Sequence, residues 1–154
     1  MKDVSIERIT EMTPEIVDAT RRLAEQLESP SQVTISEKYL QTIIDNPSAY
    51  WLMARRNDDA KYIGMAVLYM LHYPTNIRTS LENIVADGYF RRQGIGTALC
   101  EEAKRISLEK GANSIRIAAS KTNIPSKAMI EKAGFSTDYT MDHYEHWLVR
   151  GPRF

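Results

Sequence analysis

The chain is poor in cysteine, with Cys100 as its single example in 154 residues, and it has no excess charge of either sign. One cysteine excludes an internal disulfide framework and suits a reducing compartment. Twenty basic and twenty acidic residues cancel, so no overall field attracts nucleic acid or an anionic membrane. We therefore expect a cytoplasmic protein without nucleic-acid or membrane partners, in which any anion binds locally.

Long hydrophobic runs and low-complexity tracts are also missing. No apolar run approaches the ~20 residues that span a bilayer. The N-terminal sequence MKDVSIERIT alternates polar and apolar residues, unlike a signal peptide. With 43% hydrophobic and 26% charged residues, the composition is ordinary for a globular protein. Because no repeat or interdomain linker is evident, we expect residues 1–154 to form one domain with a sizeable core.

Hydrophobic periodicity and turn residues predict a mixture of strands and helices. In the first helix, Thr13 is a capping hydroxyl, Pro14 takes the first helical position, and an apolar stripe through Leu27 ends at Ser29-Pro30-Ser31. The other predicted helices are Ser36–Asp45, Gly94–Lys110 and Asn123–Ala133, and the predicted strands are Val4–Ile9, Tyr50–Arg55, Tyr62–Leu71, Leu81–Ala86, Ser114–Ala119, Phe135–Tyr139 and His143–Val149. The order βααβββαβαββ predicts an α/β (α+β) fold with a central mixed sheet and helices on its faces.

The segment Ser80–Ala98, SLENIVADGYFRRQGIGTA, has the clearest functional signal. It predicts a strand, a tight basic turn and a helix that opens at Gly94-Ile95-Gly96. The first N–H groups of a helix lack intrahelical partners and have partial positive charge, and glycine lets a ligand approach them closely. Arg91 and Arg92 add fixed positive charge, so we expect this segment to bind phosphate oxygens.

Two common phosphate-binding loops do not fit this segment. A Walker loop needs Gly-Lys-Ser/Thr, whereas Gly96 is followed by Thr97-Ala98, and a dinucleotide fingerprint needs a small residue where Leu99 stands. The sequence Arg91-Arg92-Gln93-Gly94-Ile95-Gly96 instead resembles the pyrophosphate-binding signature Gln/Arg-x-x-Gly-x-Gly/Ala of the GNAT superfamily of acyl-CoA-dependent N-acetyltransferases. The predicted element order is also similar to that of the GNAT fold.

The resemblance implies acetyl-CoA as cosubstrate and assigns residues to it. Near Arg91 and Arg92, the pyrophosphate would be cradled by the backbone N–H groups of Gln93, Gly94, Ile95, Gly96, Thr97 and Ala98. The pantetheine arm would contact backbone groups of Ile84, Val85 and Ala86, where two parallel strands part. The alternative is that Gly94 and Gly96 merely shape a turn from strand to helix.

A second match is Asn123 followed by Glu131-Lys132-Ala133-Gly134-Phe135, which is similar to the Asn, helix and Glu-Lys-x-Gly-Phe ending of many GNAT members. It implies that Asn123 contacts the pantetheine arm, with Ser126 and Lys127 near the cofactor. The alternative role of Asn123 is a helix cap. The chain departs from the family at Ile130, where many members have a tyrosine that protonates the CoA thiolate. Because a CoA thiol has a pKa near the cysteine value of ~8.5, we still expect the thiolate to leave.

For the general base we favour Glu82, because a carboxylate in a largely apolar strand invites a functional explanation. Strand alternation predicts that Glu82 shares a face with Ile84 and Ala86, and family members often have an acidic residue at this point. The alternative is a half-exposed carboxylate paired with a basic neighbour. His72 is a rival base, and we expect Cys100 to be a small buried residue rather than a nucleophile.

The resemblance predicts transfer of an acetyl group from acetyl-CoA to a primary amine of a small molecule or peptide, by direct attack in a ternary complex. We expect no metal, since His143 and His146 would lie on opposite faces of a strand. The acceptor is expected between the second helix, with its following loop, and residues 72–79. Two alternatives are a non-catalytic CoA-binding regulatory module, favoured by Ile130, and a nucleotide-binding domain that holds a different phosphate. A homodimer is common in the family and is therefore an allowed assembly.

Overall fold

The structure is a computed structural model and describes residues 3–28, 31 and 33–137. Its strands are β1 (Val4–Arg8), β2 (Ala49–Arg56), β3 (Tyr62–His72), β4 (Ile77–Ala86) and β5 (Ser114–Ile117). Its helices are α1 (Pro14–Ala24), α2 (Glu37–Ile44), α3 (Ile95–Glu109) and α4 (Ile124–Lys132), with a short 3-10 helix η1 (Gly88–Phe90) between β4 and α3. Within these described ranges, no helix is both long and apolar enough to cross a membrane.

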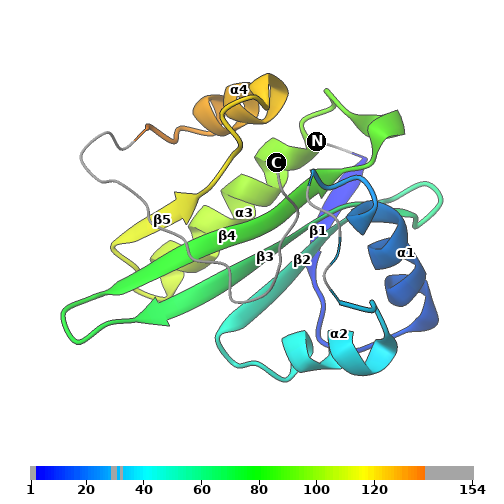
Figure 1. The fold of residues 1–154 in the computed structure, drawn as a ribbon, viewed down its shortest axis with the longest axis horizontal. Helices are drawn as coiled ribbons and strands as arrows, with labels where there is room; N and C mark the ends of the chain where they lie inside the picture. The colour runs from blue at the N-terminus through cyan, green and yellow to red at the C-terminus, as the bar shows by residue number, and fades with distance from the viewer. Residues whose placement is uncertain (1–2, 29–30, 32, 138–154) are drawn as a thin grey trace.

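The strands form one mixed sheet in the order β1-β2-β3-β4-β5 (Figure 1). Neighbours from β1 to β4 are antiparallel, whereas β5 lies parallel to β4. A parallel pair needs a crossover connection, and α3 provides it between β4 and β5. The mixed sheet with helices on its faces confirms the predicted fold class.

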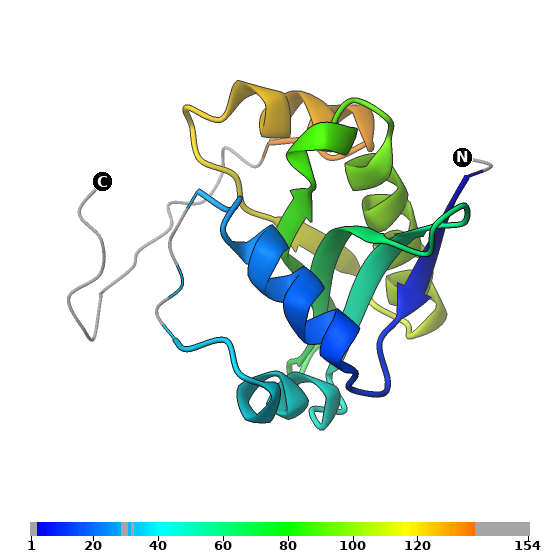
Figure 2. The same cartoon turned by 90° about the vertical axis from the view of Figure 1, so that its right-hand side faces the viewer.

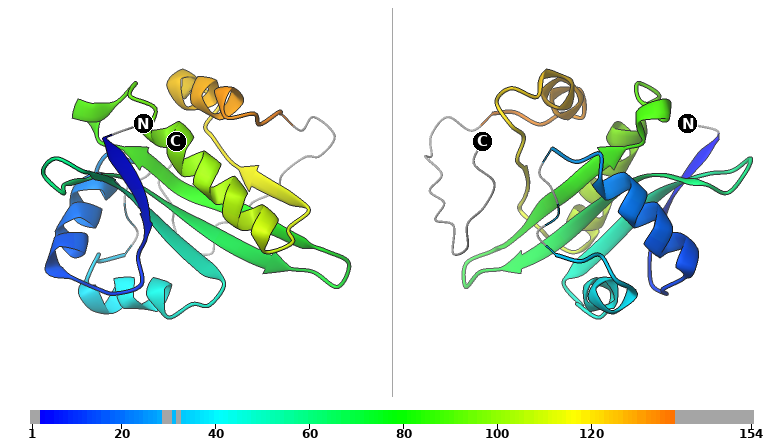
Figure 3. Two further views of the ribbon diagram at one scale, coloured as in Figure 1. Left: turned by 180° about the vertical axis from the view of Figure 1, so that it is seen from behind. Right: turned by 45° about the vertical axis from the view of Figure 1, so that its right-hand side comes forward.

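Helices cover both faces of the sheet. α1 and α2 lie on one face, which we call the α1 face, and α3 and α4 lie on the other, the α3 face (Figures 2 and 3). Alternate residues of β2 supply both cores, because Trp51 and Met53 pack on the α1 face while Leu52 and Ala54 pack on the α3 face. A strand buried on both faces has a continuous apolar sequence, as β2 and β3 do.

Two boundaries near the predicted phosphate segment differ from expectation. The predicted long connection over residues 72–79 is a tight hairpin, in which Tyr73 N donates to Asn76 O at 2.9 Å. β4 therefore begins at Ile77 rather than Leu81. Polar residues at alternate positions of β4 hid its first half, because they belong to the side of the strand that the sheet leaves partly open. β5 ends at Ile117, before the predicted end of this strand.

The structure also differs from the prediction at the end of α1 and in the segment after α4. α1 ends at Ala24, so Leu27 lies beyond the helix, although it still packs against the α1-face core. Of the predicted closing strands Phe135–Tyr139 and His143–Val149, only residues 135–137 are described, and they are not in a strand. The rest of that pair lies outside the described residues. Phe135 packs against the α3-face core, as predicted for an apolar anchor.

Candidate functional site

The parallel pairing between β4 and β5 stops before β4 ends. The last pair in register is Leu81 with Ile117, whereas β4 continues to Ala86. Along the described part of the chain, no strand pairs with residues 82–86 on the side of β5. Ala86 O accepts a hydrogen bond from Arg91 Nε at 3.4 Å. This edge of β4, which includes the predicted Ile84 and Val85, can therefore pair with an extended ligand in the way that an added strand would.

A β-bulge at Asn83 changes the phase of the side chains in β4. Met65 pairs with Val85 but Val67 pairs with Glu82, so β4 has one more residue than β3 over this interval. Asn83 absorbs the extra residue with a φ of 53°, a left-handed conformation that asparagine tolerates better than most residues. This bulge lies directly after the last pair between β4 and β5. Because bulges bend a strand and increase its twist, it accompanies the separation of the two strands.

The bulge makes the predicted face of Glu82 wrong. Ile84 and Ala86 pack toward the α3 face, together with Leu81. Glu82 pairs with Val67, which belongs to the core of the α1 face. Its carboxylate therefore lies on the α1 face, opposite to the side chains with which simple alternation had grouped it.

Glu82 is exposed and accepts a hydrogen bond from Ser80 Oγ. None of the ion pairs in the described part of the chain includes it, so the predicted alternative of a basic neighbour is not found there. Tyr69 lies on the same face, and burial raises its pKa, with smaller contributions in the same direction from Tyr39 of α2 and from Glu82. The carboxylate thus lies within electrostatic range of the Tyr69 phenol, and an aromatic ring beside a carboxylate suits an ammonium group.

α3 begins with an uncapped N-terminus beyond the end of β4. Gly94 occupies the N-cap position with a φ of 81°, and no side chain caps the helix. Arg92, just before it, is also left-handed, with a φ of 62°. The first N–H groups of α3 therefore lack side-chain partners and present the positive end of the helix dipole. This geometry agrees with the anion-binding turn predicted from Gly94-Ile95-Gly96.

Two close contacts fix that N-terminus in place. A Cβ on Gly64 of β3 would lie 2.7 Å from Cγ2 of Ile95 and 3.2 Å from Val85 O. The missing side chain therefore allows the first residue of α3 to pack directly on the sheet. On the other side, a Cβ on Gly96 would lie 3.2 Å from Sδ of Met129 in α4, so α4 covers the first turn of α3.

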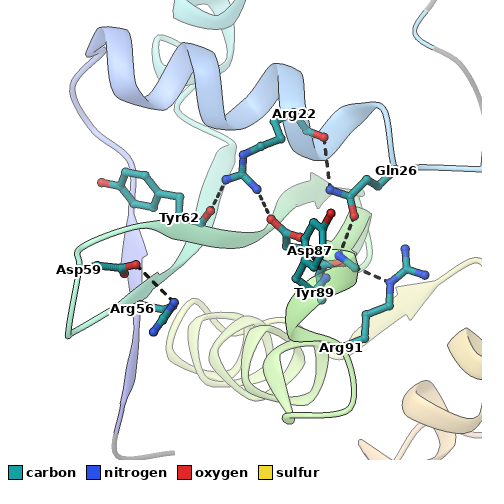
Figure 4. A network of polar contacts seen from close by, with 10 residues as sticks. Arg22, Gln26, Arg56, Asp59, Tyr62, Asp87, Tyr89 and Arg91 are labelled. Carbon is teal, nitrogen blue, oxygen red and sulfur yellow. Dashed lines mark hydrogen bonds and ion pairs between the residues drawn. The ribbon is translucent and has the colours of Figure 1, made fainter.

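A buried ion pair holds the turn between β4 and α3 (Figure 4). Asp87 is 2% exposed and pairs with Arg22 of α1. The other terminal nitrogen of that guanidinium donates to Tyr62 O at 2.5 Å. Just beyond the end of α1, Gln26 Oε1 accepts a hydrogen bond from Gly88 N at 2.7 Å. Arg22 of α1 and Gln26 thus anchor the turn that leads into the start of α3.

The comparisons with known proteins agree with this geometry. The sequence model of the acetyltransferase (GNAT) family matches residues 13–135, a range that includes β4, the basic turn and α3. The chain belongs to the GNAT acetyltransferase family. Among curated protein sequences, by contrast, no significant match is found.

Solved structures share the GNAT fold at low sequence identity. An aminoglycoside acetyltransferase from an uncultured soil metagenomic sample, in complex with sisomicin, has a TM-score of 0.83 at 19% identity, over 96% of this chain and 98% of that one. Glucosamine-6-phosphate N-acetyltransferase from Arabidopsis thaliana has a TM-score of 0.74 at 16% identity, over 95% and 99%. AAC(6')-Iy, in complex with a CoA-containing bisubstrate analogue, has a TM-score of 0.75 at 21% identity, over 94% and 98%. At these identities the likeness establishes the fold alone.

In this GNAT protein, the second matched motif forms α4. Asn123 caps the helix, because its Oδ1 accepts a hydrogen bond from Ser126 N at 3.1 Å. The capping role considered for Asn123 is therefore present, and its side-chain NH2 group can still donate to a ligand. Lys127 is exposed on the same helix, and Ile130 is half-buried.

The remaining candidates are separated from Glu82. His72 ends β3 and pairs with Ile77, which packs against the α3-face core, so the imidazole lies on the face opposite to Glu82. Cys100 is fully buried in α3, and burial raises the pKa of its thiol to about 11. It is thus a small buried residue, as predicted. His143 and His146 lie outside the described residues.

Sequence reasoning missed the contribution of α1 and of two residues on the α1 face. Arg22 and Asp87 are 65 positions apart, and no local pattern connects them. Tyr69 looked like one more apolar residue of β3, and Arg116 of β5 was not singled out. Only the register of β3, β4 and β5 places Tyr69 and Arg116 in one row with Ser80.

Proposed function

We propose that this GNAT protein is an N-acetyltransferase that transfers an acetyl group from acetyl-CoA to a primary amine, by direct attack in a ternary complex. The observation that supports this most is the separation of β4 from β5 just before a helix with an uncapped N-terminus. The pantetheine arm would add to the free edge of β4 as an extra strand does. Its pyrophosphate would then lie at the positive end of α3.

The proposed cofactor site is built mainly from backbone groups. The pyrophosphate oxygens accept hydrogen bonds from the N–H groups of Gln93, Gly94, Ile95, Gly96, Thr97 and Ala98. Arg91 and Arg92 add charge beside them, and both are exposed. The pantetheine arm lies along Ile84, Val85 and Ala86, with Asn123, Ser126 and Lys127 of α4 on its other side.

The proposed reaction forms one bond and breaks one. The amine nitrogen attacks the thioester carbonyl carbon, the C–N bond forms, and the C–S bond breaks to release CoA thiolate. Before the attack, Glu82 holds the acceptor ammonium and passes one of its protons to water, because a carboxylate is a weak base for an ammonium group and does not keep the proton. The nitrogen loses its second proton to solvent as the C–S bond breaks. The thiolate then takes a proton from solvent.

A second candidate is a CoA-binding regulatory module without turnover. Ile130 favours it, because this side chain has no proton to give where many family members have a tyrosine. We rank it below the enzyme, since a thiol with a pKa near ~8.5 makes an adequate leaving group unaided.

The test measures thiol release from acetyl-CoA with a panel of amines, comprising amino acids, amino sugars, polyamines, aminoglycosides and N-terminal peptides. Calorimetry measures acetyl-CoA binding in parallel. Acceptor-dependent release is expected. Binding of acetyl-CoA without release on any amine would support the regulatory module. Binding of ATP or NAD in preference to CoA would overturn both and leave a nucleotide-binding domain.

A further inference from the structure

Polar side chains line the part of the α1 face formed by β3, β4 and β5. The strand registers arrange the residues of this area in three rows. The first is Leu71, Arg78 and Ser114, the second is Tyr69, Ser80 and Arg116, and the third is Val67 and Glu82. The isoleucines of β5, Ile115 and Ile117, pack toward the α3 face. Of the first two rows, Tyr69 packs against the α1-face core, whereas Arg78 and Ser80 are half-buried and Ser114 and Arg116 are exposed.

The two arginines of these rows have no carboxylate partner among the described residues. Elsewhere in that part of the chain, Arg21, Arg22, Arg55, Arg56 and Arg105 each form an ion pair, whereas Arg8, Arg91 and Arg92 do not. The guanidinium of Arg78 lies over the ring of Tyr73, with Cζ 5.6 Å from the centroid, which restrains its position. Arg116 is exposed in the neighbouring row. Two adjacent guanidinium groups without a carboxylate partner among the described residues attract an anion.

Arg78 and Arg116 line one recess of about 30 Å³ together with Ser80 and Ser114. Their guanidinium N–H groups and the Ser114 hydroxyl are donors for anionic oxygens, whereas the Ser80 hydroxyl donates to Glu82. A recess of this size holds one end group and not a whole substrate. The rest of a ligand bound here would extend over the α1 face.

Glu82 lies on the same face as this recess. It follows Ser80 by two positions in β4, which is about 7 Å at the rise of a strand. Arg78 lies a further two positions away, so one small molecule spans the distance from the carboxylate to the recess. The face therefore offers an acceptor one negative group for its ammonium and two positive groups for an anion.

We propose that the acceptor of this enzyme is a small amine that also has an anionic group, and that Arg78 and Arg116 bind that group. The inference rests on the proposed acetyltransferase function and names its substrate class. The ammonium faces Glu82, and the anion, a carboxylate or a phosphate, occupies the recess. A polycation such as an aminoglycoside is disfavoured, because its second ammonium would meet the guanidinium groups of Arg78 and Arg116.

Matched acceptor pairs test the proposal. Comparing glucosamine 6-phosphate with glucosamine measures the effect of a phosphate group on acetylation. Comparing free amino acids with their amides measures the effect of a carboxylate. We expect the anionic member of at least one pair to have a kcat/KM roughly 10–100-fold higher, the effect of hydrogen bonds to charged groups. Arg78→Gln and Arg116→Gln should each raise the KM for that member roughly tenfold. The KM for the neutral member and the acetyl-CoA affinity should not change.

The control variant is Arg105→Gln, which removes an exposed guanidinium from α3 on the other face and should change neither KM. Equal use of both members of every pair would overturn the proposal. So would a preference for polyamines or aminoglycosides, or an equal effect of Arg78→Gln on anionic and neutral acceptors.

If acetyl-CoA binds but no amine is acetylated, the proposed function fails, and the anion site is then tested alone. Inorganic phosphate is titrated into the CoA complex while NMR follows the arginine side-chain signals. Saturable shifts in the wild type that Arg78→Gln and Arg116→Gln abolish support an anion site. The absence of such shifts overturns it.

Discussion

The two proposed sites next to β4 would recognise their ligands by different means. Where β4 and β5 separate, the proposed cofactor site consists of a free strand edge and an uncapped helix N-terminus, so backbone groups do most of the binding. On the α1 face, the proposed acceptor site consists of side chains, with Glu82, Arg78 and Arg116 each from a different row. A backbone site needs only the right turn and glycines, and a short motif can predict it. A side-chain site needs the register between strands, which no short motif contains.

The first way to test this difference is a substitution in α1, which anchors the turn between β4 and α3. Arg22→Met would leave the carboxylate of Asp87 buried without its cation. Removing one partner of a buried ion pair costs about 3–5 kcal/mol, and we expect a loss near the lower end because Arg22 is partly exposed. Urea unfolding measures the change. Asp59→Asn is the control, since it breaks an exposed pair with Arg56 and should cost less than ~1 kcal/mol. Equal losses from both variants would contradict an anchoring role.

The second way separates chemistry from cofactor binding. Glu82→Gln should lower kcat by about 100-fold, the lower end of the range for a general acid or base, and leave acetyl-CoA affinity unchanged. Steady-state kinetics over a range of pH values and calorimetry measure the two effects. Glu109→Gln on α3 is a carboxylate control on the opposite face. A rate that is unchanged across the whole pH profile would remove Glu82 from the mechanism.

The third way acts on the α3 face alone. Gly64→Ala would push Cγ2 of Ile95 and shift the start of α3, because the added Cβ would lie 2.7 Å from that atom. Overpacking of this kind costs about 1–3 kcal/mol, and we expect acetyl-CoA to bind roughly tenfold more weakly. Gly88→Ala is the control, since its Cβ would meet only Gln26 Oε1, at 3.4 Å. Normal acetyl-CoA affinity in Gly64→Ala would mean that the packing of Ile95 on Gly64 does not position the cofactor.

The fourth way sharpens the question of the missing general acid. Ile130→Tyr supplies a phenol on α4, and Ile130→Phe supplies the same bulk without the hydroxyl. We expect the two variants to have kcat values within about threefold of each other, because a thiolate from a thiol of pKa ~8.5 leaves without help. A rise of ~100-fold in the tyrosine variant alone would show that protonation of the thiolate limits turnover.

The smallest effect is expected at Cys100, which belongs to neither proposed site. Burial raises the pKa of its thiol to about 11 from 9.0, so the thiolate is scarce in the folded protein below that pH. Iodoacetamide should therefore alkylate the native protein slowly at pH 8 and faster as the pH rises toward 11. Because the unfolded chain loses this proton first, the thiol's contribution to stability falls as the pH rises from about 9 to 11. The Cys100→Ala variant should keep the kcat of the wild type. A loss of turnover would instead indicate that the Cys100 thiol acts as a nucleophile.

The sequence predicted the elements as far as α4 because the signals for them are local. Thr13 and Ser36 accept the hydrogen bonds expected of N-cap residues, and Gly111 follows α3 with a φ of 78°. The positive φ at Gly94 is equally local, which is why the turn at the start of α3 could be placed, while its role in binding stays a prediction.

The failures have a different physical origin. The face of the sheet on which Glu82 lies depends on a bulge. No residue pattern from Leu81 to Ala86 predicts the extra residue. The first half of β4 was missed because Arg78, Thr79 and Ser80 form a polar run, in which Thr79 is buried and bonded to Ser107 of α3. The pair of Arg22 and Asp87 exists only after α1 packs on the sheet, and a contact 65 positions apart leaves no local trace.

The bulge at Asn83 also separates two kinds of evolutionary freedom. Before it, substitutions at positions 78, 80 and 82 change only what the α1 face presents. After it, Ile84 and Ala86 turn toward the α3 face, and Val85 pairs with Met65 under α1. If the acceptor binds as proposed, a lineage can exchange acceptors by point mutations in the first half of β4 while the second half stays under constraint. Deleting Asn83 would instead let Glu82, Ile84 and Val85 follow one another in regular alternation opposite β3, so it would remove the bulge without changing the face of any other residue.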